Sequence, residues 1–369
     1  MDYIQKKIDN MEKELNNTGV VKTTPIYIIV CISLLISLVS SILIAVTMGS
    51  VDISVRDVYR VILYKGFSVG NGNTLPDNSV IDIVWYIRLP RIILAVGVGM
   101  GLSVSGVVMQ AIVKNPLADP FILGISSGAS LGATLAIMLG VGISFGPNYV
   151  GIAAFIGAFV ISLLVISMSN VNGRSNSIKL LLSGMALSTL SSSFSSFIVY
   201  FSENKQGIKD ITYWLMGSLA GANWENIRLV LPIVLISTIF FITQYRTLNL
   251  MLLGDDVSIT LGKDLHLYRI LYLLIASLMV GLIVYSSGII GFVGLIIPHI
   301  IRMIFGTNHK KTVLITGLSG SIFLIWADVC SRIIIPGSEL PIGILISIIG
   351  APIFIYLMTS KSYGFGGKL

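Results

Sequence analysis

Long uncharged stretches alternate with short polar connections along most of this chain. A helix of about 20 residues crosses the roughly 30 Å hydrocarbon core of a bilayer, and several of the stretches reach that length. The clearest is Ile92–Val113, a run of 22 uncharged residues between Arg91 and Lys114. The pattern predicts ten membrane-spanning helices, near residues 23–51, 92–113, 121–141, 150–169, 180–202, 229–245, 268–287, 289–305, 312–329 and 340–360.

Proline and glycine divide the predicted helices. Pro90 suits the first turn of the second helix, and Asn115-Pro116 suits its end, because the residue before a proline disfavours the α conformation. Ser286-Ser287-Gly288 and then Gly291 predict that a short or interrupted eighth helix follows the seventh. Glycines at four-residue spacing predict that neighbouring backbones pack closely. They are Gly97, Gly101, Gly124, Gly128 and Gly132.

The ends of the chain and its basic residues predict an orientation. Residues 1–22 are polar and lack the apolar core of a cleaved signal peptide, so we expect a cytoplasmic N-terminal tail. Residues 23–360 form the predicted membrane domain, and residues 361–369 form a second cytoplasmic tail. With the N-terminus inside, 15 of the 24 Lys and Arg residues fall on the cytoplasmic side. Cytoplasmic loops are enriched in Lys and Arg, so this distribution favours both termini in the cytoplasm.

Composition excludes several classes of protein. The chain is 54% apolar and only 11% charged, against about 25% charged in an ordinary soluble domain. Its mean hydropathy of +0.92 excludes a soluble globular protein. The net charge of +7 is scattered among apolar stretches, so no nucleic-acid partner is expected. Cys31 and Cys330 fit small buried side chains better than a disulfide, and the scattered histidines predict no metal site.

The source of energy also follows from the sequence. The chain has no G-x-x-x-x-G-K-[ST] motif, which a nucleotide-binding P-loop requires. We expect the spans to lack the carboxylate, lysine and arginine side chains through which an ion-coupled carrier usually relays protons or sodium. Energy for transport would then enter from a partner protein. The alternatives are an ion-coupled secondary transporter and a membrane scaffold that transports nothing.

The segment Arg88–Gly132 carries a long motif, RLPRIILAVGVGMGLSVSGVVMQAIVKNPLADPFILGISSGASLG. It resembles the FecCD-type permeases of iron-chelate and cobalamin ABC importers. The resemblance resumes at residues 213–219 (YWLMGSL), 288–306 (GIIGFVGLIIPHIIRMIFG) and 339–355 (ELPIGILISIIGAPIFI). It implies an all-α polytopic membrane protein with the inverted-repeat organisation of a type II ABC importer permease. Arg91-Ile92-Ile93-Leu94 and Arg269-Ile270-Leu271 give a faint echo of such a repeat, although chance similarity between apolar helices gives the same pattern.

The same resemblance implies a cargo and partners. FecCD-type permeases move ferric siderophores, haem or cobalamin, and iron chelates are the commonest of these cargoes. The chain would act in the cytoplasmic membrane as a homodimer, or as a heterodimer with a similar permease. Two ATPase subunits and an extracellular or periplasmic substrate-binding protein would complete the importer. The chain is then no enzyme and holds no cofactor, because ATP and Mg²⁺ bind to the ATPase.

The longest predicted cytoplasmic loop, residues 246–269, has an amphipathic pattern. Gly254-Asp255 divides it into two short helices, which could dock a soluble subunit or lie on the lipid surface. The resemblance implies that this loop couples the permease to the ATPase. The residues to which it assigns this role are Leu253, Gly254, Asp255, Asp256 and Leu261.

Three arginines lie on the predicted external side, Arg88, Arg91 and Arg332. A guanidinium group binds carboxylates in a bidentate manner and stays charged, so these side chains could capture acidic residues of another protein. Extension of the side chains toward lipid phosphates is the alternative. The resemblance implies that they receive glutamates of the substrate-binding protein.

Two further groups of residues are candidates for the transport path. The resemblance implies a cytoplasmic gate in two loops, at Asn115, Pro116, Leu117, Ser177 and Ile178, which could otherwise be ordinary tight turns. The fifth span is rich in serine, which is costly against lipid and favourable beside water. Its predicted pathway-lining residues are Ser188, Ser191, Ser192 and Ser195. Serine-mediated packing of helices would give the same composition.

Overall fold

The computed structural model describes residues 20–49, 51, 53–69, 75–171, 177–335 and 337–359. Apart from residues 20–22, the two predicted tails lie outside this part of the chain. The regular secondary structure of the described residues is entirely helical. The longer helices are α2 (Val20–Thr47), α5 (Leu89–Val113), α6 (Ile125–Leu139), α7 (Tyr149–Asn170), α8 (Ser177–Tyr200), α10 (Trp224–Thr243), α13 (His266–Ser287), α14 (Val293–Phe305), α15 (His309–Ile333) and α16 (Ile342–Thr359).

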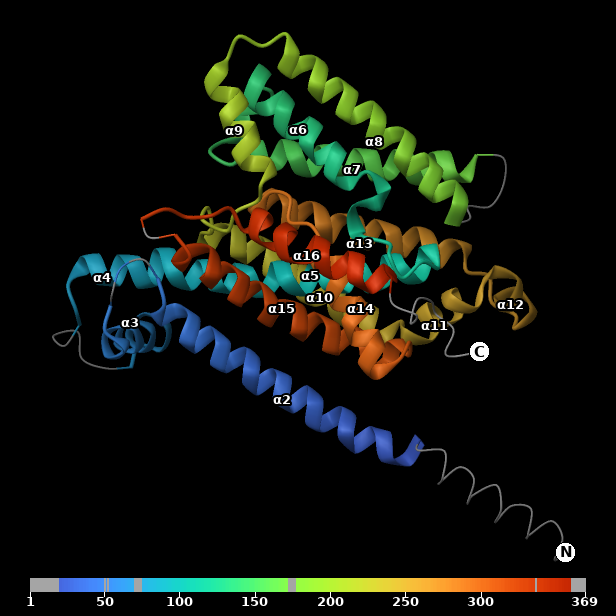
Figure 1. The fold of residues 1–369 in the computed structure, drawn as a ribbon, viewed down its shortest axis with the longest axis horizontal. Helices are drawn as coiled ribbons and strands as arrows, with labels where there is room; N and C mark the ends of the chain where they lie inside the picture. Colours follow the sequence, from blue (N-terminus) through green and yellow to red (C-terminus); the bar gives the residue numbers. More distant parts are fainter. Residues whose placement is uncertain are drawn as a thin grey trace, which may run out of the picture.

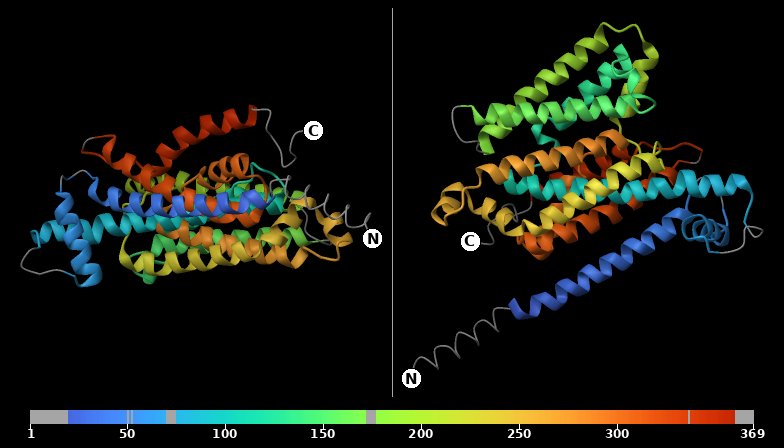
Figure 2. Two further views of the ribbon diagram at one scale, coloured as in Figure 1. Left: turned by 90° about the horizontal axis from the view of Figure 1, so that it is seen from below. Right: turned by 180° about the vertical axis from the view of Figure 1, so that it is seen from behind.

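Shorter helices connect these elements at the two ends of the molecule (Figure 1). They are α3 (Val55–Phe67), α4 (Asn78–Asp82), the π-helical turn Ile83–Arg88, the 3₁₀ turns Pro120–Leu123 and Ile143–Phe145, α9 (Lys205–Leu215), α11 (Tyr245–Leu253) and α12 (Asp255–Thr260). The end that carries α3 and α4 is named the α3 end below, and the end that carries α11 and α12 is named the α12 end. Figure 2 shows that α3 runs across the direction of the long helices.

A helix lies in each of the ten ranges that hydropathy predicts. Seven helices in the described residues are long and apolar enough to cross a membrane. The other three, α6, α14 and α16, are shorter apolar helices. The expected interruption between the seventh and eighth ranges is present, because α13 ends at Ser287 and α14 has only 13 residues. The fold is therefore polytopic, while the number of crossings and the domain boundaries stay predictions.

The centre of the molecule is α5. It packs against α10, α13, α14 and α15, and Figure 1 shows it running through the middle of the bundle. In its most apolar window, 89% of the residues are buried, against 17% in α8. On one side of this bundle, α6, α7, α8 and α9 form a separate layer, and α2 lies on the opposite side (Figures 1 and 2). Helix α5 is thus enclosed by other helices, whereas α8 leaves a long face uncovered.

Small residues allow the closest helix contacts. A β-carbon at Gly99 of α5 would collide with the carbonyl oxygen of Gly320 in α15, and one at Gly106 would collide with that of Gly294 in α14. Gly132 of α6 meets the backbone of α7 in the same way. The predicted role of the glycine stripe is confirmed in α6. In α5, Gly97 and Gly101 instead face side chains, and the backbone contacts are made by neighbouring glycines.

Pro90 lies in the first turn of α5, as the sequence predicts, although the helical backbone continues on its N-terminal side. The helix runs from Asn78 to Val113, with a π-helical turn at Ile83–Arg88 directly before the proline. A proline in a helix interior lacks an N–H group and its ring crowds the carbonyl four residues earlier. A π-helical turn changes the hydrogen-bond spacing at that place and accommodates the ring. Arg88, at the end of this turn, and Arg91, just after Pro90, are both buried.

Candidate functional site

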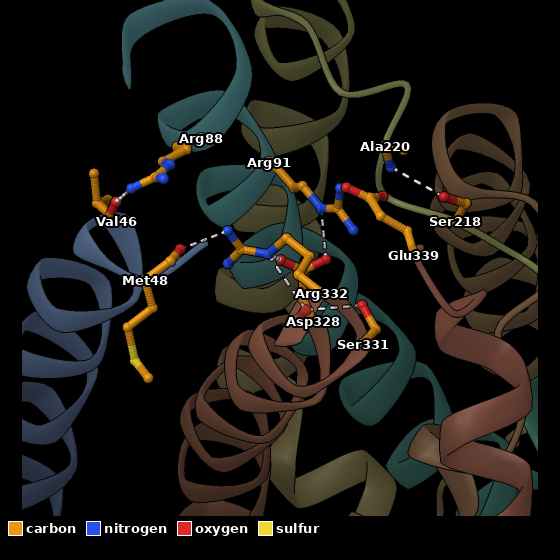
Figure 3. Close-up of polar contacts among 10 residues, drawn as sticks. All are labelled: Val46, Met48, Arg88, Arg91, Ser218, Ala220, Asp328, Ser331, Arg332 and Glu339. Carbon is orange, nitrogen blue, oxygen red and sulfur yellow. Dashed lines mark hydrogen bonds and ion pairs between the residues drawn. The ribbon is translucent and has the colours of Figure 1, made fainter. Parts of the chain in front are cut away.

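At the α3 end, Arg91 joins α5 to α15 and to the segment before α16 (Figure 3). Its Nε donates a hydrogen bond to Oδ1 of Asp328 at 2.7 Å, and its Nη1 donates one to Oε2 of Glu339 at 2.8 Å. The Asp328 side chain is fully buried and that of Arg91 is 5% exposed, whereas that of Glu339 is 48% exposed. Two of the three groups are enclosed by protein, and the third reaches the surface.

Arg332 lies one helical turn after Asp328 on α15. Its Nε lies 3.1 Å from Oδ2 of Asp328, and its Nη1 donates to the carbonyl oxygen of Met48 at 2.8 Å. Its Nη2 is buried and has no hydrogen-bond partner among the described residues. Arg91, Arg332, Asp328 and Glu339 are named the arginine–carboxylate cluster. Its two positive and two negative charges cancel, which lowers the cost of burying them.

Arg88 has a different set of partners. Its guanidinium donates to the carbonyl oxygens of Val46 and Thr47, at 3.2 and 3.1 Å, and to that of Val51. The last carbonyl groups of a helix have no partner within the helix, so Arg88 satisfies two of these groups at the end of α2. The three predicted docking arginines therefore lie at the same end of the molecule, but all three are buried and bound to acceptors of this chain.

The position of Asp328 overturns one expectation. The sequence predicts spans free of carboxylates, with the ninth near residues 312–329. In the structure, α15 continues to Ile333, and the fully buried Asp328 lies within it. A signal for this cluster exists in the sequence, because Asp328 and Arg332 are four residues apart and so lie on one face of a helix.

At the α12 end, an acidic residue joins three elements. Oδ1 of Asp255, the first residue of α12, accepts from Nη2 of Arg269 in α13 at 2.5 Å. Its Oδ2 lies 3.9 Å from Nζ of Lys114, the residue that ends α5. The Arg269 side chain is only 2% exposed, while those of Lys114 and Asp255 are about one-third exposed. Asp255, a predicted ATPase contact, is therefore also an internal link between the loop and two long helices.

Most predicted gate residues are held at the same end of α5. Oγ of Ser177 donates to the carbonyl oxygen of Ile112 at 3.0 Å, which ties the start of α8 to α5. Arg302 of α14 donates to Oε1 of Gln110 and, at 3.2 Å, to the carbonyl oxygen of Pro116. Oδ1 of Asn115 accepts from the backbone N–H of Leu117 at 2.9 Å. Ile178 is separate from these contacts, with 66% of its surface exposed.

Asp119 lies between this loop and the 3₁₀ turn Pro120–Leu123. Its Oδ1 accepts a hydrogen bond from the backbone N–H of Phe121 at 2.8 Å. Burial raises the pKa of the Asp119 carboxyl to about 6, although this hydrogen bond acts to lower it. Among the described residues it makes no ion pair. The carboxyl therefore titrates closer to neutrality than an ordinary aspartate.

The loop at the α12 end has the predicted form. Helices α11 and α12 are separated at Gly254, whose φ of +105° favours glycine. Leu253 and Leu261 are 59% and 63% exposed, and Asp256 is exposed beside them. Thr247, Leu248, Met251 and Ser258 form the buried side. The element therefore presents an apolar surface away from the bundle, at one extremity of the molecule (Figure 1).

The serine-rich helix α8 lines two open grooves. Ser188 and Ser192 line a groove of about 780 Å³, together with Thr189, Ser193, Ser196, Phe197 and Tyr200. Ser192 and Ser195 also line a second groove of about 540 Å³, between α8, α6 and α9. Ser191 lines neither groove and is buried. Three of the four predicted pathway residues thus share a weakly polar surface that carries no charged side chain.

The described residues contain no group of three or more His, Cys, Asp or Glu side chains that could hold a metal ion. Cys31 and Cys330 are free thiols. The features that remain are two polar clusters at opposite ends of α5 and an uncovered serine-lined surface between them.

Comparison with known proteins agrees with this arrangement. A model of the FecCD transport family matches residues 31–360. The chain is 39% identical over 279 residues to the cobalamin import system permease BtuC of Halobacterium salinarum, with 76% of this chain and 74% of the relative covered. It is 36% identical over 293 residues to the hemin transport system permease HmuU of Yersinia pestis, with 77% and 86% covered.

One solved structure is also similar. It is described as an inward-facing conformation of a metal-chelate type ABC transporter, and it covers 89% of this chain and 98% of its own. The two share 32% sequence identity and superpose with a TM-score of 0.75. The residues matched by the family model include α5 and both of its ends.

Proposed function

The chain belongs to the FecCD transport family and is a permease subunit of an ABC importer, and we propose that its cargo is a ferric siderophore, with haem or cobalamin as the alternatives. The serine-lined surface of α8 carries this proposal. It is broad, weakly polar and free of charged side chains, which suits a bulky chelate that must be passed on rather than held tightly.

A second copy of the chain would cover α8. This helix leaves most of its surface open, including the aromatic side chains of Phe194, Phe197 and Tyr200. Exposed serine beside exposed aromatic residues fits a surface that meets water on one part and protein on another. The transport path then runs between two permeases. Disulfide formation between two copies of Ser192→Cys would test the arrangement, whereas a single-copy complex in nanodiscs would contradict it.

An ATPase subunit would bind α11 and α12 of each permease. The exposed Leu253 and Leu261 flank Gly254 at the α12 end and offer an apolar contact for a cleft in a soluble protein. Two ATPase subunits would bind ATP and Mg²⁺, and movement of this loop would open the gate formed by the ends of α5 and α8. The α12 end then lies in the cytoplasm, together with both termini, and the chain resides in the cytoplasmic membrane.

A substrate-binding protein would dock at the opposite, external end. Arg88, Arg91 and Arg332 gather there, and guanidinium groups are suited to carboxylates on a partner. Binding at the α3 end and ATP hydrolysis at the α12 end would then alternate access to the path between the two copies.

Uptake by cells tests the proposed cargo. Labelled ferric siderophores, haem and cobalamin are offered to cells with and without this chain, and with and without depletion of ATP. We expect uptake of one cargo to be lost on deletion and on ATP depletion alike. Dependence of haem or cobalamin uptake on the chain would select the alternative cargo, and uptake of all three without the chain would contradict the proposal.

A further inference from the structure

The arginines proposed to receive a partner's carboxylate already bind carboxylates of their own chain. Arg91 is buried and bonded to both Asp328 and Glu339, and Arg332 is buried beside Asp328. A binding protein that approached this surface would meet no bare guanidinium at Arg91. Docking through Arg91 therefore requires that one of the two internal carboxylates leave it.

The two carboxylates differ in how firmly they are held. Asp328 is fully buried, lies within α15, and contacts two arginines at 2.7 and 3.1 Å. Among the described residues Glu339 makes one ion pair, and its side chain is 48% exposed. It follows α15 in the non-helical segment that leads into α16, with Gly337 at a φ of +77° just before it. Glu339 can leave Arg91 by side-chain rotation alone, whereas Asp328 cannot leave without movement of a helix.

The charges of the cluster favour replacement over simple loss. With Glu339 in place, two arginines face two carboxylates and the net charge is zero. Without Glu339 the cluster carries one uncompensated positive charge next to the surface, and it then attracts an anion. Nη2 of Arg332 supplies a further buried donor that has no partner among the described residues. A carboxylate from a partner that takes the place of Glu339 would therefore meet an uncompensated positive charge and a hydrogen-bond donor.

We propose that Glu339 is an exchangeable internal ligand of Arg91, which a carboxylate of the substrate-binding protein replaces when that protein docks. The inference rests on the proposed docking role of the arginines. It adds that Glu339 competes with the partner's carboxylate for Arg91. Glu339 keeps the cluster neutral while no partner is present and lowers the affinity of the resting permease for acidic surfaces. Because Leu340 donates its N–H to the carbonyl oxygen of Ser331 at 3.0 Å, the backbone next to Glu339 stays attached to α15 while the side chain exchanges.

Binding measurements on the complete importer test the exchange. The permease and its ATPase are placed in nanodiscs, and the partner is the extracellular binding protein whose deletion abolishes the same uptake. We expect Glu339→Gln to bind that protein about tenfold more tightly, equivalent to about 1.4 kcal/mol, because the competitor has lost its charge. The affinity should also fall more steeply with salt, because the cluster now carries a net charge.

The control is Glu225→Gln, which removes the same charge from an exposed residue in the first turn of α10. That turn lies at the same end, because the indole of Trp224 donates to the carbonyl oxygen of Trp85 at 3.0 Å. The affinity of this variant should match that of the wild type. Adding Arg91→Gln to Glu339→Gln should abolish the gain, because the exchanged ligand then has no arginine to bind.

The outcomes separate the two proposals. If the wild type binds, Arg91→Gln weakens binding, and Glu339→Gln fails to tighten it beyond the control, docking stands and the exchange is overturned. If Arg91→Gln and Arg332→Gln leave binding unchanged, the docking role itself is overturned, and the exchange with it. Retained ATPase association and an unchanged elution profile show that Glu339→Gln is folded.

Discussion

Arg91, near the start of α5, and Arg302, which contacts the last turn of α5 and the loop after it, are held by different chemistry. At the α3 end, Arg91 pairs with the charged side chains of Asp328 and Glu339. At the α12 end, Arg302 donates to uncharged oxygens, the side-chain amide of Gln110 and the carbonyl group of Pro116. Hydrogen bonds between charged groups are stronger and more sensitive to loss of one partner than hydrogen bonds to a neutral acceptor. The contacts of Arg91 are therefore more sensitive to removal of a single charge than those of Arg302.

The two ends of α5 also differ in the helices that they join. The arginine–carboxylate cluster joins α5 to α15 and contains one member at the surface. The other end gathers the start of α8, α14 and α12 around the last turn of α5, through Ser177, Arg302 and Lys114. One end offers a group that can be exchanged with a partner. The other collects moving elements around a single helix terminus, which suits the transmission of a displacement.

Removal of the buried carboxylate should have the largest effect on stability. Asp328→Asn leaves Arg91 and Arg332 without their shared counter-ion, and breaking a buried ion pair in this way costs about 3–5 kcal/mol. We expect a sharp loss of folded permease in thermal unfolding monitored by size-exclusion chromatography in detergent. Asp256→Asn, at an exposed position of α12, should change little. Equal stability of the two variants would show that the cluster contributes nothing to folding.

Removal of Arg302 should have a smaller effect. Arg302→Met deprives the Gln110 amide and the Pro116 carbonyl of a donor, and an unsatisfied buried polar group costs about 1–3 kcal/mol. The loop after α5 should also loosen, so a Leu117→Cys reporter in this background should react faster with a thiol reagent. Arg246→Met, which alters an exposed arginine of α11, provides the control. Unchanged reactivity at position 117 would mean that Arg302 does not hold the loop.

Loss of the Lys114 side chain should affect transport more than stability. Its ion pair with Asp255 spans 3.9 Å and is about one-third exposed, so Lys114→Met should cost less than about 1 kcal/mol. If this contact carries movement of α12 to the gate, the ATP hydrolysed per cargo molecule imported should rise severalfold in proteoliposomes. Lys310→Met removes an exposed lysine of α15 and should preserve the ratio. A preserved ratio in Lys114→Met as well would rule out this route of coupling.

The smallest expected effect concerns Asp119. Its hydrogen-bond partner is a backbone N–H group, whereas Asp328 contacts two arginines. Burial raises its pKa to about 6 from an ordinary value of 3.8. Between these values only the folded state keeps the proton, so this group makes the free energy of unfolding fall as pH rises from about 4 to 6. Between pH 4 and 6 the unfolding temperature of Asp119→Asn should rise more, or fall less, with pH than that of Asp210→Asn, which alters an exposed aspartate. Identical slopes would contradict the raised pKa.

Hydropathy was sufficient to place the long helices and the division of the α11–α12 loop at Gly254, because both depend on local composition and on one glycine. It could not predict the partners of the arginines. Glu339 lies 248 residues after Arg91 and Asp328 lies 237 residues after it, so their contacts depend on the packing of α15 against α5. Asp328 was missed for a second reason. From the sequence alone, a carboxylate such as Asp328 marks the end of a membrane span. Only the structure shows that Arg91 and Arg332 neutralise it inside the helix bundle.

Some candidate site residues could likewise be predicted from local sequence, and others are known only from contacts in the fold. Ser177 and Asn115 could be assigned to one region because both lie at predicted helix ends. That Lys114, Gln110 and Arg302 join them there follows from side-chain contacts across α5, α14 and α12, for which the sequence gives no local pattern. Pro90 lies in the first turn of α5 as its position predicts, but the π-helical turn that continues the helical backbone before it has no local pattern in the sequence.

That turn also fixes the rotational phase of the residues on either side of it. Successive residues of an α-helix are about 100° apart around the axis, and the π-helical spacing at Ile83–Arg88 changes this angle locally. Arg88, the last residue of the turn, reaches the end of α2, and Arg91, three positions later in the α-helix, reaches α15 and the segment before α16. A deletion of one residue within the turn would preserve hydropathy and helix content, yet it would rotate α4 relative to both arginines and their acceptors. Chain length at this point is therefore constrained as strictly as residue identity.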